Sequence, residues 1–113
     1  MERRYYLGEF EEMVLLVVVV QHGEAYGLSI TSVIEEDLKR SVNMSSVHTA
    51  LYRLEEKGYV KSEMGGATGK RGGRRKRIFL ITATGKAALM EAKQTRQYLW
   101  GQIPSHLFEI GGV

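Results

Sequence analysis

The sequence contains no cysteine, one proline and one tryptophan among its 113 residues. Without cysteine, a disulfide scaffold, a thiol nucleophile and a thiolate metal site are all excluded. The three histidines, His22, His48 and His106, lack the spacing of paired metal ligands, so we expect no metal and no cofactor. No order of Ser, His and Asp suggests a catalytic triad, and we expect the protein not to be an enzyme.

A long hydrophobic run is also missing. The longest apolar run, Met13 to Val20, is far shorter than the roughly 20 residues that a membrane-spanning helix needs. It follows Glu9, Glu11 and Glu12, whereas the leading region of a signal peptide is basic. We therefore expect no membrane partner, a cytoplasmic protein, and a helix or strand in this run that is buried on all sides.

The charge is unevenly distributed, although the formal net charge is a modest +3. Residues 1–37 hold two basic and eight acidic residues, a net charge of −6, and residues 38–113 hold 14 basic and five acidic residues, a net charge of +9. Six basic residues lie close together in the sequence: Lys70, Arg71, Arg74, Arg75, Lys76 and Arg77. Such a cluster suggests a polyanionic partner; the alternative is a solvated, solubilising loop.

Apolar periodicity and capping residues predict four helices. They run from Gly8 to about Gln21, from Gly27 to about Leu38, from Asn43 to Lys57, and from Thr82 or Thr84 to about Ile103. Acidic residues at the start of the first helix suit its dipole. In the second helix, an apolar stripe is expected at Leu28, Ile30 or Thr31, Val33, Ile34 and Leu38. Gly58 is expected to stop the third helix.

Two alternating segments, residues 59–64 and 76–81, predict a hairpin around a glycine-rich loop. Part of that loop, from Gly65 to Arg71, superficially resembles a phosphate-binding P-loop. However, Met64 stands where the first glycine is required, and Arg71 stands where Ser or Thr should bind magnesium. The loop is therefore not interpreted as a nucleotide site.

The third helix has two different faces. Its apolar face carries Val47, Ala50, Leu51 and Leu54. Its other face carries side chains that can reach base edges and phosphates: Ser45, Ser46, His48, Thr49, Tyr52 and Arg53. This pattern is typical of a DNA recognition helix. The alternative is an ordinary exposed face, with Arg53 paired to Glu55 or Glu56.

The fourth helix, about 30 Å long, overhangs the core that three shorter helices can build. Its spare apolar surface predicts a second copy of the chain as its partner. The expected dimer interface comprises Leu7, Phe10, Leu89, Ala92, Leu99 and Ile103. Trp100 and Tyr98 either pack in this interface or stack on a flat aromatic effector.

The order helix, helix, helix, hairpin, helix predicts an α+β, mostly α fold: a winged helix-turn-helix with a long C-terminal dimerisation helix. The expected DNA-binding domain covers residues 1–82, with the wing hairpin at about 59–81. The dimerisation helix covers 83–104, and a tail covers 105–113.

The sequence resembles the PadR family of bacterial transcriptional regulators. The resemblance lies in the stretches LGEFE from Leu7, YGLSI from Tyr26, LYRLEEKGYV from Leu51 and FLITATG from Phe79, and covers about residues 5–103. It implies a homodimer that binds a two-fold operator in double-stranded DNA, usually as a repressor. Some short members of the family also bind flat aromatic compounds near the dimer interface.

Three features depart from the family pattern. His48 stands where the family commonly has Tyr, the loop 65–73 is longer and richer in glycine, and the chain ends soon after the fourth helix, as in short members. Two other functions stay open: a small-molecule sensor with DNA binding as its output, and a winged-helix module that binds only proteins.

Overall fold

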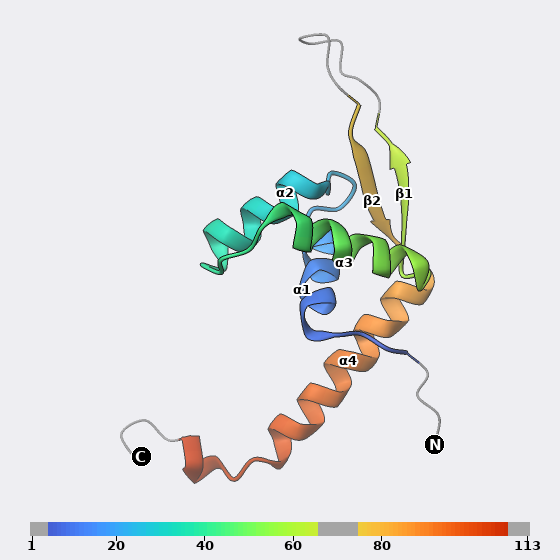
Figure 1. Cartoon of the computed structure of the whole chain (residues 1–113). Coiled ribbons are helices and arrows are strands. Elements are labelled where there is room, and N and C mark those ends of the chain that lie inside the picture. The colour runs from blue at the N-terminus through green and yellow to red at the C-terminus, as the bar shows by residue number, and fades with distance from the viewer. Residues whose placement is uncertain (1–4, 66–74, 109–113) are drawn as a thin grey trace.

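The computed structural model describes residues 5–65 and 75–108, and its elements follow the predicted order (Figure 1). Helix α1 (Glu9–Val20) precedes α2 (Gly27–Ser32), which continues into a π-helical turn, η1 (Val33–Asp37). Then come α3 (Met44–Glu56), β1 (Val60–Met64), β2 (Arg77–Ile81), α4 (Ala83–Gln102) and a 3-10 turn, η3 (Ser105–Phe108). The predicted α+β, mostly helical class is confirmed.

The predicted helix ends coincide with caps. The Asn43 side chain accepts a hydrogen bond from the backbone N–H of Ser46, at 2.8 Å, at the start of α3. Gly58, just beyond the other end of α3, has a φ of +79°, which favours glycine. Thr82, rather than Thr84, caps α4, because its Oγ1 accepts from the Gly85 N–H at 3.0 Å.

Helix α1 contains the apolar run, and the prediction that this run is buried on all sides is wrong. Val14, Leu15, Val17 and Val18 are buried, whereas Leu16, Val19 and Val20 are 46%, 41% and 76% exposed. The reason is geometric: a helix turns its side chains through every direction, and α1 is covered by α2, α3 and β2 without being enclosed by them.

The second helix is also less enclosed than its apolar stripe predicts. Ile30 and Ile34 are fully buried, but Leu28 and Leu38 are 52% and 47% exposed. The helix ends at Asp37, in a turn widened by a hydrogen bond from the Leu38 N–H to the Val33 carbonyl at 3.1 Å.

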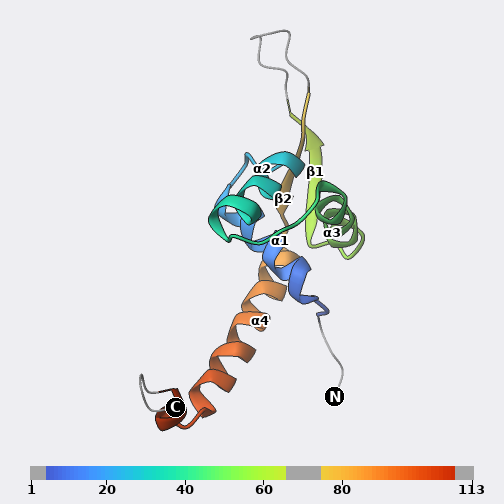
Figure 2. The same cartoon turned by 60° about the vertical axis from the view of Figure 1, so that its left-hand side comes forward.

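The hairpin and α4 extend from opposite ends of the helical body (Figures 1 and 2). Strands β1 and β2 are antiparallel, with Val60 opposite Ile81, and the Phe79 N–H donates to the Ala25 carbonyl at 2.9 Å. In α4, Gly85 and Ala88 are buried, whereas residues 93–102 are exposed. The architecture is a winged helix-turn-helix with a projecting C-terminal helix.

The segment after α4 folds back on that helix. The predicted tail contains η3, whose Phe108 ring packs edge-on against Trp100 with centroids 5.7 Å apart. Within the described part of the chain, none of the helices is both long and apolar enough to cross a membrane.

Candidate nucleic-acid interface

The polar face of α3 is exposed, as predicted. Val47, Ala50, Leu51 and Leu54 fill the core, and all six predicted recognition residues lie on the exposed surface: Ser45, Ser46, His48, Thr49, Tyr52 and Arg53. The structure divides these six residues between two grooves, one on each side of the helix.

The first groove joins α3 to the base of the hairpin. It has a volume of about 570 Å³ and is lined by His48 and Tyr52 together with Arg75, Lys76 and Arg77. An imidazole and a phenol therefore share one surface with three cations. This arrangement suits simultaneous contact with bases and phosphates.

Residues at the start of α2 form the floor of this groove, and the sequence analysis did not assign them a role in the site. Tyr26, Gly27 and Leu28 all line it. A Cβ atom on Gly27 would lie 2.8 Å from Nε2 of His48, so a glycine is needed for the imidazole to lie against α2. The one sequence signal for this contact was Gly27 itself. Glycine is a poor helix former, so a glycine that begins a helix indicates that another group lies close to its backbone.

Intramolecular contacts hold two of the hairpin cations in place. The Lys76 ammonium lies 4.3 Å from the ring centroid of Tyr26. Arg77 donates to Ser62 Oγ at 2.9 Å, and Ser62 Oγ donates in turn to the Glu55 carboxylate on α3 at 2.8 Å. The base of the hairpin is thus tied to both helices of the helix-turn-helix. The other predicted cations, Lys70, Arg71 and Arg74, lie outside the described residues.

The second groove lies between α3 and the start of α1. It has a volume of about 630 Å³, and Ser45, Ser46, Thr49 and Arg53 line it opposite Glu11. Arg53 Nη1 lies 3.9 Å from the Glu11 carboxylate. The ion-pair partner of Arg53 is therefore Glu11, 42 positions earlier in the chain, and not the neighbouring Glu55 or Glu56.

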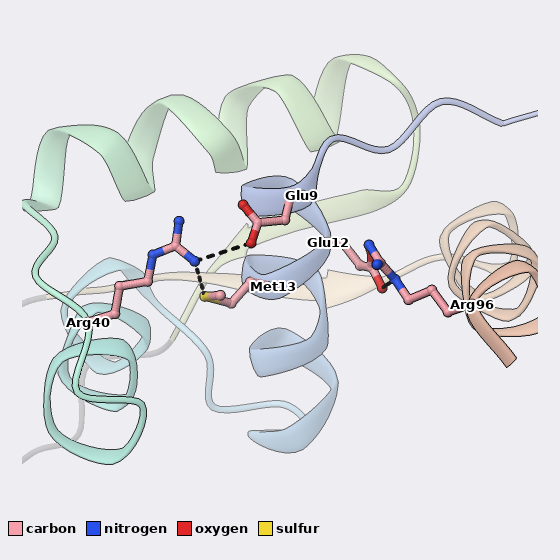
Figure 3. Close-up of polar contacts among 5 residues, drawn as sticks. All are labelled: Glu9, Glu12, Met13, Arg40 and Arg96. Carbon is pink, nitrogen blue, oxygen red and sulfur yellow. Dashed lines mark hydrogen bonds and ion pairs between the residues drawn. The ribbon is translucent and has the colours of Figure 1, made fainter. Parts of the chain in front are cut away.

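The acidic first turn of α1 contacts three separate parts of the molecule. Glu11 accepts from the Lys57 ammonium at 2.5 Å. Figure 3 shows Glu9 and Glu12 pointing to opposite sides of α1, toward Arg40 and Arg96. From the sequence, the helix dipole was the only role predicted for these acids, because their partners lie far away in the chain.

The pair between Glu12 and Arg96 has two hydrogen bonds. Arg96 Nε donates to Glu12 Oε2 at 3.2 Å, and Nη2 donates to Oε1 at 2.6 Å. The hydrogen bond and the negative charge of Glu12 raise the pKa of Arg96 above its ordinary value. Within residues 5–65 and 75–108, no three His, Asp or Glu side chains are grouped as a metal site would need.

The predicted interface residues differ in exposure. Leu7, Phe10 and Leu89 are half-buried against the core of their own chain, and Ala92 and Ile103 are also half-buried. Leu99, Tyr98 and Trp100 are 57%, 66% and 62% exposed. An apolar groove of about 440 Å³ that no sequence pattern predicted lies beside α1. Its apolar walls are formed by Met13, Leu16, Val17, Val20, Val33 and Leu38.

Solved structures with this fold include regulators from several bacteria. A PadR-like transcriptional regulator from Bacillus cereus is 19% identical with a TM-score of 0.71, covering 88% of this chain and 92% of that one. A PadR family transcription regulator from Clostridium difficile is 24% identical with a TM-score of 0.63, covering 81% and 92%.

Bacillus subtilis PadR, solved in complex with operator DNA, is 24% identical with a TM-score of 0.61. The match covers 74% of this chain but 45% of that protein, so this chain spans less than half of its length. No curated protein sequence matches the chain.

A family model provides the assignment. The model of the transcriptional regulator PadR-like family matches residues 15–91, from the middle of α1 into α4, and includes the whole helix-turn-helix and the hairpin. Because this match covers well over half of the sequence, the chain belongs to the PadR-like family of transcriptional regulators.

Proposed function

We propose that the protein is a dimeric, sequence-specific regulator that binds a two-fold operator in double-stranded DNA and acts as a repressor in the cytoplasm. The observation that carries the proposal is the groove in which His48 and Tyr52 of α3 share one surface with Arg75, Lys76 and Arg77. The operator DNA bound to Bacillus subtilis PadR supports it.

In this proposal, residues 1–82 bind DNA and α3 enters the major groove. Ser45, His48, Thr49 and Tyr52 follow one another at helical spacing and read base edges. The hairpin cations contact phosphates, and the first turn of α3 offers backbone N–H groups to a further phosphate. Arg53, paired with Glu11, is assigned to the edge of the contact surface.

Residues 83–104 provide the dimer contact in the same proposal. Half of α4 is exposed, and it carries the large apolar side chains of Tyr98, Leu99 and Trp100. The apolar groove beside α1 offers a second uncovered surface on the same chain. Exposed apolar patches of this kind mark association sites, and a two-fold dimer would cover both.

An affinity titration tests sequence-specific binding. The wild-type protein is titrated at near-physiological salt with a duplex from the promoter of its own operon and with a random duplex of equal length. We expect clearly tighter binding to the promoter duplex, and in vitro transcription from it should fall as the duplex is occupied. Equal affinity for both duplexes would refute specific recognition.

A triple variant distinguishes a DNA-binding protein from a winged-helix module that binds only proteins. Changing Arg74, Arg75 and Arg77 to alanine should abolish most DNA binding, because it removes cations from the hairpin. A folded triple variant with wild-type DNA affinity would favour the module instead.

The exposed Trp100 favours a second candidate function, an aromatic effector bound at the dimer contact. Trp100 packs edge-on against Phe108 yet is 62% exposed, so one face is free to stack on a planar ligand. It is the only tryptophan of the chain, so its fluorescence reports on this position alone. A panel of planar aromatic compounds should include one that quenches it saturably; no response across the panel would remove this support.

A further inference from the structure

Helix α4 packs on the body through Leu89 and is also attached to it by polar contacts at two places. At its start, Thr82 Oγ1 donates to the Gly58 carbonyl at 2.6 Å, and Gly85 packs against the backbone at Tyr59. Two turns beyond Ala88, the last fully buried residue of the helix, Arg96 forms its two hydrogen bonds with Glu12 of α1. Two separated points of attachment fix the direction of a rod, whereas one point leaves its angle free.

The carboxylate at the second attachment point has little access to water. The Glu12 side chain is 13% exposed, and the Arg96 side chain that covers it is 57% exposed. Two parallel hydrogen bonds between a guanidinium and a carboxylate are also directional. The pair therefore favours one orientation of α4 relative to α1, as Figure 3 illustrates.

The same first turn of α1 also holds the helix-turn-helix. Glu9 pairs with Arg40, in the segment that leads into α3, at 3.4 Å, and Glu11 pairs with Lys57 at the end of α3. Three carboxylates on one turn thus connect both ends of the recognition helix to the projecting helix. Helix α1 is therefore in contact with both α3 and α4.

We propose that Arg96 and Glu12 are positioning residues that set the half-site spacing of the operator. The inference rests on the proposed dimer. A tilt of about 10° at the base of a helix of 20 residues would move its far end by about 5 Å. That displacement is about one and a half base-pair steps of roughly 3.4 Å. Half-site spacing on DNA follows dimer geometry, so this pair selects among spacings.

The test first enriches two-fold sites from a random duplex pool with the wild-type protein. The enriched half-sites are then rebuilt with spacings that differ by one base pair, and binding is measured for wild type, Glu12→Gln and Arg96→Met. A reversed pair, Glu12→Lys with Arg96→Glu, tests rescue. Lys93→Met is the matched control, because it removes one exposed positive charge from the same helix.

We expect the wild type and Lys93→Met to prefer one spacing by about tenfold over its neighbours, and both single variants to lower that preference to about threefold or less. The affinity of both single variants for an isolated half-site should equal that of the wild type. The reversed pair should restore the preference for one spacing. A loss of folding alone would lower half-site affinity as well.

Two outcomes would overturn the inference. One is a wild-type spacing preference in both single variants. The other is a monomeric Glu12→Gln or Arg96→Met variant in sedimentation, since the pair would then hold the dimer together instead of setting its geometry. Failure of the wild type to enrich any two-fold site would instead refute the proposed function itself.

Discussion

At the scale of the residue, Gly27 and His48 illustrate how one missing side chain shapes a surface. The sequence places Gly27 at the start of the second helix and His48 on the polar face of the third, and no sequence pattern connects the two residues. In the folded chain the imidazole lies 2.8 Å from where a Cβ of residue 27 would be, closer than such an atom allows. The position of the His48 imidazole therefore depends on the residue at 27.

Gly27→Ala should move the imidazole without unfolding the protein. The atom nearest to the added Cβ is the far end of the His48 side chain, at 2.8 Å, which can rotate away. We expect the free energy of unfolding to stay nearly constant and half-site affinity to fall by about tenfold, or about 1.4 kcal/mol. Urea denaturation and a DNA titration measure the two effects.

Gly8→Ala is the matched control, because a Cβ at Gly8 meets nothing within 4 Å. Wild-type DNA affinity in the Gly27→Ala variant would contradict a role for His48 in base contact.

At the scale of the element, α1 and α4 show different relations between local sequence and environment. The valines of α1 are poor helix formers, yet the segment is helical because four of its side chains enter the core. Helix α4 has the opposite character. Its first turn packs closely on the backbone of Tyr59, and the helix also contacts α1. Residues 93–102 are exposed, and in this half only Arg96 is described as paired with the body.

Two glycines of α4 should respond in opposite ways to the same substitution. A Cβ at Gly85 would overlap the Tyr59 carbonyl oxygen, which is backbone and cannot move aside. We expect Gly85→Ala to lower the free energy of unfolding by about 3 kcal/mol.

Gly101→Ala, in the last turn of the same helix, meets open space and should raise that free energy by about 0.5 kcal/mol. Thermal and urea unfolding of both variants give the comparison. Equal effects of the two substitutions would show that Gly85 does not pack against the Tyr59 backbone as described.

At the scale of the whole molecule, the hairpin and α4 project from opposite ends of the body (Figure 2). Cations at the base of the hairpin, together with exposed apolar side chains on α4 and an apolar groove beside α1, suit a molecule that holds DNA and a second copy of itself at the same time. Because the two ends are far apart, a substitution at one end should leave the other unaffected.

The substitution Val20→Lys tests whether a second copy of the chain covers the apolar groove beside α1. Val20 is 76% exposed in the single chain, so a lysine there should leave the protomer folded. If a second copy covers the groove beside α1, the added charge would be buried without a partner, and the dimer dissociation constant should rise by more than about tenfold. Analytical ultracentrifugation measures it.

Met64→Lys, on the hairpin and 47% exposed, is the control and should leave the dimer unchanged. A wild-type protein that sediments as a stable monomer at micromolar concentration would refute the dimer.

Salt dependence tests the basic end. For each phosphate that the protein no longer neutralises, the slope of log affinity against log salt should become shallower by about 0.9. Arg75→Ala combined with Arg77→Ala should therefore reduce that slope by about 1.8. Lys93→Ala lies in α4, which extends from the opposite end of the body from the hairpin (Figure 1), and should not change it. An unchanged slope in the double variant would show that these two residues do not contact phosphates.

Much of this protein follows from its sequence alone. The helical order, the Asn43 cap, the stop at Gly58, the buried face of α3 and the hairpin could all be predicted, because periodicity, capping and glycine conformations are local properties. The pairing of Arg53 with Glu11 and the use of Gly27 beside His48 could not, since each depends on segments far apart in the chain.

Only the tertiary structure decided which elements contact one another and which surfaces stay exposed. It divided the polar face of α3 between two grooves, left one side of the apolar helix α1 uncovered, and joined the acidic turn to cations from three other segments. The physical reason is the range of the forces involved. Capping and periodicity act within a few residues, whereas ion pairs and packing join whatever the fold brings within a few ångströms.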